Sequence, residues 1–176
     1  MKWPAFIVLA LLTVAAQVTA GAVFRIDLGG GLLLAVDLLA IVAVLLALRV
    51  RAGTQVMLAG WVLGLFIDLA SSATPIGLYA LTFALAAGMV FQLRGAVFTS
   101  NPVTQMAMTF VFCLVSHGGA RIFIRAAVRP PGGPLGLELL QALLLALCTA
   151  VVAPAVMALV RKFDWLILPP RSQRLR

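Results

Sequence analysis

Residues 60–80 read G-W-V-L-G-L-F-I-D-L-A-S-S-A-T-P-I-G-L-Y-A, an apolar segment, a short polar turn and the start of a second apolar segment. Small or polar residues recur at every fourth position, at Gly60, Gly64, Asp68 and Ser72. Residues four apart share one face of a helix, so the two glycines form a flat groove with a carboxylate at its end. Because lipid tails and leucine are equally apolar, membrane helices associate through such small-residue faces. We therefore expect this face to point inward.

The composition indicates that the whole chain, and not only residues 60–80, belongs in a membrane. Hydrophobic residues make up 64% of the chain and charged residues 10%, and the mean hydropathy is +1.16. That leaves too little polar surface to coat a water-soluble globule. The apolar runs are continuous, without the alternation of transmembrane strands, which favours helices. We expect an all-α polytopic membrane protein: a bundle of about six transmembrane helices in residues 1–160, then a basic cytoplasmic tail in residues 161–176.

The expected helices are the apolar runs between turns, each near the length that a span needs. The third and fifth look short or interrupted by glycine, so five spans with a re-entrant pair remain an alternative. The first run is also compatible with a secretory signal cleaved before Gly21, because Val18 and Ala20 satisfy the small-residue rule. The six runs are 3–24, 32–48, 54–69, 76–93, 103–117 and 135–160.

The basic residues report the orientation of the chain. A net charge of +8 in a soluble protein would suggest nucleic acid, but here it is tested first as a topology signal, and we expect no nucleic-acid partner. An amino terminus in the cytoplasm explains the charges best, and both termini then lie inside. Most of the 13 basic residues fall on the cytoplasmic side in that topology: Lys2, Arg49, Arg51, Arg94, Arg161, Lys162, Arg171, Arg174 and Arg176.

Three acidic residues fall within the expected spans. A charge there costs about 2.5–3.5 kcal/mol on insertion scales, so each acid needs a partner or a purpose. All of Asp37, Asp68 and Glu138 are expected in the outer half, with Asp37 about a turn and a half inside the second helix. They either pair with basic residues to hold the bundle together or form a polar docking surface for a partner helix or small ligand. The basic residues expected at that depth are His117, Arg121, Arg125 and Arg129.

Residues 60–80 resemble the signature of the rod-shape-determining protein MreD family. The resemblance also includes the basic pair after a leucine-rich span and the sequence M-A-L-V-R-K at 157–162. The chain differs in having Val36 before Asp37, where proline is common, and Ser72 after Ser71, where glycine is usual. The matching residues of the central motif are Gly64, Asp68, Leu69, Ser71, Thr74, Pro75, Gly77, Leu78 and Ala80.

The resemblance implies a non-enzymatic component of the bacterial elongation machinery in the cytoplasmic membrane. Such a protein binds MreC and works with MreB, RodA and a class B penicillin-binding protein in lateral wall synthesis, without a cofactor. Independently of the resemblance, the small-residue helix faces and the acidic and basic residues in the outer half indicate a bundle that binds a partner. The residues expected to bind that partner or to hold the bundle are Asp37, Gly60, Gly64, Asp68, Gly77, His117, Arg121, Arg125 and Glu138.

The carboxyl-terminal tail, R-K-F-D-W-L-I-L-P-P-R-S-Q-R-L-R, combines an interfacial tryptophan with five basic residues. A polybasic segment beside a membrane attracts anionic lipid by about 1 kcal/mol per basic residue. Lipid anchoring is the simpler interpretation, and contact with a cytoskeletal filament is the alternative. The residues concerned are Arg161, Lys162, Trp165, Arg171, Arg174 and Arg176.

Two other functions compete with this interpretation. An enzyme is disfavoured because the neighbours Ser116 and His117 point about 100° apart on a helix and cannot form a dyad on one face. The cysteines Cys113 and Cys148 lack metal-ligand spacing, so we expect neither a metal nor catalysis. A small-molecule transporter, or the substrate-binding subunit of a vitamin uptake system, is the stronger rival, because short helices with acids in their outer halves suit a solute site.

Overall fold

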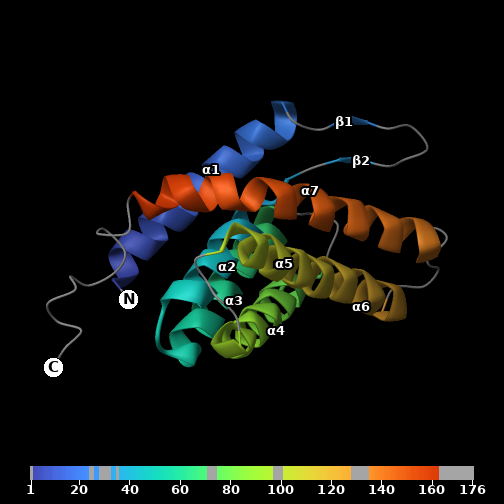
Figure 1. Ribbon diagram of the computed structural model, residues 1–176. Coiled ribbons are helices and arrows are strands. Elements are labelled where there is room, and N and C mark those ends of the chain that lie inside the picture. The colour runs from blue at the N-terminus through green and yellow to red at the C-terminus, as the bar shows by residue number, and fades with distance from the viewer. Residues whose placement is uncertain are drawn as a thin grey trace, which may run out of the picture.

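The computed structural model describes residues 2–23, 26–27, 33–34, 36–70, 75–96, 101–127 and 135–162, and almost all of them are helical (Figure 1). The continuous run of α5, the π-helical turn η2 and α6 counts as one helix, so these residues form six helices and confirm the all-α prediction. The elements are α1 (Trp3–Val23), β1 (Ile26–Asp27), β2 (Leu33–Leu34), α2 (Leu38–Arg49), α3 (Gly53–Ala70), α4 (Leu78–Leu93), η1 (Arg94–Ala96), α5 (Pro102–Cys113), η2 (Leu114–Gly118), α6 (Gly119–Ala127) and α7 (Leu135–Arg161). The short strands β1 and β2 pair antiparallel.

Three of the described helices are long and apolar enough to cross a membrane: Gly53–Ala70, Pro102–Ala126 and Leu135–Val160. The apolar helices Trp3–Thr19, Leu38–Arg49 and Leu78–Leu93 are shorter. The third and fifth expected spans, which look short or interrupted by glycine, do contain glycines but are not short in the structure. Both belong to the long set, because glycines inside an apolar run are compatible with a membrane helix when neighbouring helices pack against them.

Helix α2 lies at the centre of the bundle. Ten of its 12 residues are buried, and it contacts α1, α3, α4, α5 and α7 (Figure 1). A helix that is apolar on every side is suited to such a position, since it has no polar face to turn toward solvent. At 1.5 Å per residue it is about 18 Å long. It is therefore a core element, surrounded by longer helices.

The glycine face of α3 packs against α4, as predicted. A Cβ added at Gly60 would lie 2.9 Å from Phe83 O, and one at Gly64 would lie 2.7 Å from Ala80 Cα and clash with Tyr79 O. Only glycine allows the two backbones to approach so closely. The alanine stripe of α7 is buried too, at Ala142, Ala146 and Ala150. Small residues thus set the helix spacing at both places.

Two helix boundaries differ from the prediction. Helix α2 begins at Leu38 and not at residue 32, because the Asp37 side chain accepts a hydrogen bond from Ala40 N and caps the helix. The fifth helix does not end at His117 but continues through η2 and α6 to Ala127. The glycine pair at 118–119 lies inside this helix. A Cβ added at Gly119 would lie 3.7 Å from the side chain of Thr82 on α4. Packing against α4 thus stabilises a helical segment that glycine alone would weaken.

Candidate functional site

Asp37 lies where the chain enters α2 and is 4% exposed. Its Oδ1 atom accepts a hydrogen bond from Ala40 N at 3.1 Å. Its own backbone N–H donates to Thr149 Oγ1 on α7, also at 3.1 Å. The residue therefore caps one helix and connects it to another, and it does not stand a turn and a half inside the helix as expected.

The second oxygen of Asp37 contacts a histidine from another helix. His117 Nε2 lies 2.8 Å from Asp37 Oδ2, and both side chains are buried. With Asp37 as a carboxylate, which only accepts, the imidazole N–H is the donor. The rings of Tyr79 and Phe83 meet the imidazole edge to face, with centroids 5.6 Å and 6.0 Å away. The histidine is thus held between an acid and two aromatic rings.

His117 reaches this position from the π-helical turn η2, in which Ser116, His117 and Gly118 are all buried. Single π-helical turns inside α-helices are rare and occur frequently at functional sites. The wider turn here directs three consecutive residues inward, which a regular helix face does not do. Ser116 Oγ donates to Cys113 O at 3.3 Å and does not bond to the imidazole.

Gln17 joins α1 to the same point. Its Nε2 atom donates to Val36 O at 3.1 Å, and its Oε1 atom accepts from Leu38 N at 2.7 Å. The face of α1 that carries Thr13 and Gln17 therefore points inward, since Thr13 is buried as well. The segment from Val36 to Leu38 is consequently held by side chains of α1, η2 and α7.

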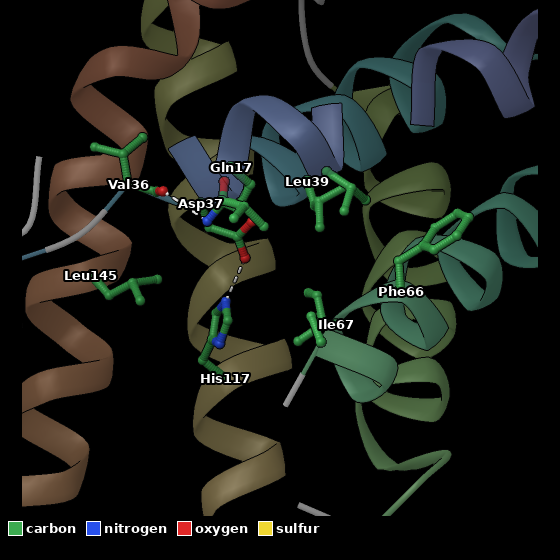
Figure 2. A pocket seen from close by; sticks show the side chains of 11 residues that line it. Gln17, Val36, Asp37, Leu39, Phe66, Ile67, His117 and Leu145 are labelled. Carbon is green, nitrogen blue, oxygen red and sulfur yellow. Dashed lines mark hydrogen bonds and ion pairs between the residues drawn. The ribbon is translucent and has the colours of Figure 1, made fainter. Parts of the chain in front are cut away.

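A pocket of about 200 Å³ opens beside this junction (Figure 2). Its walls are apolar and come from α1, α2, α3 and α7, whereas Gln17, Asp37 and His117 provide its polar atoms. Figure 2 shows His117 pointing at Asp37, with Ile67, Phe66 and Leu39 on one side and Leu145 on the other. An apolar cavity with a few convergent polar groups is the usual form of a small-molecule site.

Asp68 occupies a different environment at the end of α3, where it is 1% exposed. Its Oδ2 atom accepts from Gly77 N and Ala80 N, both at 3.0 Å, and its Oδ1 atom accepts from Tyr79 N at 3.1 Å. Gly77 has φ +99°, a conformation that side chains disfavour. The three bonds satisfy backbone N–H groups that open α4 and would otherwise lack partners. The carboxylate thus orders the start of this helix.

Arg94 binds backbone carbonyls at the end of α2, whereas Asp68 binds backbone N–H groups at the start of α4. Its guanidinium donates to Ala47 O at 3.1 Å, to Val50 O and to Arg51 O, and lies 4.0 Å from the Phe91 ring centroid. Carbonyls at the end of a helix lack intrahelical donors, and a guanidinium supplies several. The residue therefore closes the carboxyl end of α2.

Among the described residues, Asp37 bonds to His117, one of the basic residues expected at its depth, and Asp68 bonds to backbone N–H groups. Arg121 and Arg125 lie on α6, beyond His117, and Arg121 Nε is buried without a hydrogen-bond partner. Glu138 lies in the first turn of α7, 11 residues before Thr149, or about 16 Å along the axis. It is therefore not part of the pocket.

Several predicted residues fall outside the described part of the chain: Ser72, Arg129, Trp165, Arg171, Arg174 and Arg176. The side chain of Arg161 does too, whereas Lys162 is described and exposed. The sequence missed Thr149, Tyr79 and Arg94 as site or capping residues. A polar residue on the alanine-lined face of α7 was the available signal for Thr149, since a threonine there must find a partner.

No family model, curated protein or solved structure matches this chain. In the described ranges no three His, Cys, Asp or Glu side chains come together as metal ligands would. The fold and the site define a helical membrane protein in which a buried Asp–His pair and a glutamine border an apolar pocket. Such a site can bind a hydrogen-bonding or charged group attached to an apolar body.

Proposed function

We propose that this chain is a non-enzymatic membrane component of the bacterial elongation machinery, similar to MreD. In this proposal it lies in the cytoplasmic membrane with both termini inside and binds MreC. Through that partner it works with RodA, a class B penicillin-binding protein and MreB. The basic tail adds contacts with anionic lipid.

One observation carries the proposal. The described residues of the motif include three that act together: Gly64 allows α3 and α4 to touch, Asp68 binds the backbone at the start of α4, and Gly77 adopts a positive φ. A chance likeness in sequence would not require these residues to depend on one another. The motif is therefore a coherent device for fixing a helix hairpin, as expected of a scaffold that offers a fixed surface to another membrane protein.

Recovery of the partner tests the proposal. The tagged full chain is purified from its native membrane in mild detergent, and co-purified proteins are identified by mass spectrometry. We expect a single-span protein with a coiled-coil segment, and weaker recovery with Asp68→Leu at equal expression. Reporter fusions at each terminus test the orientation. Absence of any single-span partner, or a carboxyl terminus outside the cell, contradicts the proposal.

The pocket favours a second candidate, a substrate-binding subunit for solute uptake. The pocket has apolar walls and three polar side chains, Gln17, Asp37 and His117. This combination is better suited to binding a small ligand than to a purely structural role. Native mass spectrometry of the purified chain separates the two functions. A small molecule that stays bound stoichiometrically, without a protein partner, favours uptake, whereas a protein partner favours the scaffold.

A further inference from the structure

We infer that the pocket beside Asp37 is a binding site for a small amphipathic amine, one ring in size, whose ammonium group is held by the Asp37 carboxylate. This inference is independent of whether the chain binds MreC. It names the ligand class of the pocket that favours the second candidate function.

The charge of the site selects the cation. Asp37 is buried, its Oδ1 atom accepts from Ala40 N, and its Oδ2 atom lies 2.8 Å from His117 Nε2. Each carboxylate oxygen has two lone pairs, so Oδ2 retains one for a further donor. Among the described residues that line the pocket, none is a lysine or arginine. An ammonium group would therefore meet the Asp37 carboxyl group with only the His117 imidazole beside it among these lining residues.

The size of the site limits the rest of the ligand. A cavity of about 150 Å³ lined by aliphatic and aromatic side chains accommodates benzene. The present pocket, at about 200 Å³, has room for one ring and a short aminomethyl arm. The wall side chains are valine, leucine, isoleucine, phenylalanine and alanine, which suit an uncharged body. Benzylamine has this shape and serves as the probe.

The local backbone is arranged to keep the acid in place when the pocket is filled. Gln17 binds the backbone on both sides of Asp37, at Val36 O and Leu38 N, and Thr149 binds its N–H. The π-helical turn η2 holds His117 against the Asp37 carboxyl group. Such support from neighbouring hydrogen bonds lets a ligand bind without first ordering the site, which improves affinity.

The experiment compares three probes of one shape and different charge: benzylamine, benzyl alcohol and benzoate. The purified full chain in detergent is titrated with each at neutral pH, and binding is followed by the melting temperature and by ligand-observed NMR. We expect saturable stabilisation by benzylamine, with affinity about tenfold above that of benzyl alcohol, as charge-assisted hydrogen bonds exceed neutral ones, and none by benzoate.

Two variants of matched chemistry locate the site. Val14 lines the pocket on α1, whereas Val8 on the same helix is 52% exposed and lies away from it. Val14→Phe should fill the cavity and remove benzylamine binding, whereas Val8→Phe should bind as the original chain does. Asp37→Asn keeps an oxygen that can cap α2 and should remove the preference for the amine over the alcohol. Each variant is first melted without ligand to show that it folds.

Equal stabilisation by benzylamine and benzyl alcohol, or unchanged amine binding in Val14→Phe, would overturn the inference. The same ammonium chemistry occurs in phosphatidylethanolamine, so a last arm identifies the source. Benzylamine binding is compared in nanodiscs of phosphatidylglycerol with and without phosphatidylethanolamine. Loss of binding in the mixed discs assigns the site to the lipid headgroup, and unchanged binding assigns it to a free amine.

Discussion

The two buried carboxylates of this bundle, Asp37 and Asp68, differ in what binds them. Asp68 accepts three backbone N–H groups from the segment that opens α4, so its bonds lie within one helix hairpin. Asp37 accepts one backbone N–H and one histidine, and it borders a pocket. Both acids are hydrogen-bonded, as buried polar groups generally are. The comparison shows that one carboxylate is committed to structure and that the other retains capacity for a ligand.

The largest effect is expected on the Asp68 side, from Gly64→Leu. The new side chain would overlap the backbone of Tyr79 and Ala80, which cannot move without separating α3 from α4. We expect a loss of more than about 3 kcal/mol, measured as a lower melting temperature in detergent. Gly88→Ala is the control, because a Cβ there meets only the flexible side chain of Met57 at 3.3 Å. Equal melting of Gly64→Leu and the original chain would contradict the close packing.

Asp68→Leu should have the next largest effect. Three N–H groups would lose their acceptor, and each unsatisfied buried group costs about 1–3 kcal/mol. Asp68→Asn retains one acceptor oxygen and should therefore lie between Asp68→Leu and the original chain. Thermal melting and hydrogen exchange at the start of α4 measure both. If Asn and Leu are equally tolerated, Asp68 has no ordering role.

Asp37→Asn should cost less, about 1–2 kcal/mol, because the cap on α2 is retained while the charge-assisted bond to His117 is weakened. The same measurement applies, with His117→Gln as the companion variant. Because the two residues share one hydrogen bond, the double variant should lose less stability than the sum of the single losses. Strict additivity would show that the pair contributes no coupling energy.

Gln17→Leu should have the smallest effect on stability and the clearest effect on α1. The variant loses two part-buried hydrogen bonds, to Val36 O and Leu38 N, of about 0.5 kcal/mol each, and gains apolar surface that lipid accepts. We expect faster hydrogen exchange in α1 and an unchanged α3–α4 hairpin. Thr19→Val is the control, since the Thr19 hydroxyl bonds only within its own helix. Faster exchange throughout the bundle would argue against a local role.

Much of the fold could be read from the sequence. The helical class and the inward glycine face of α3 follow from hydrophobicity and from the spacing of four, which are local properties of a helix. The role of Asp68 was also within reach, because its partners lie only 9 to 12 residues away. The helix boundaries at Asp37 and His117 were not, because capping and π-helical turns leave no periodic signal.

The sequence by itself determined that this chain is a set of apolar helices with a few acids that need partners, because burying charge in hydrocarbon is costly wherever it occurs. Only the tertiary structure decided which partners they have. Asp37 meets His117 across 80 residues and Thr149 across 112, and such contacts depend on how whole helices pack. The pocket likewise exists only because α1, α2, α3 and α7 meet at that point, and no property of a single helix specifies it.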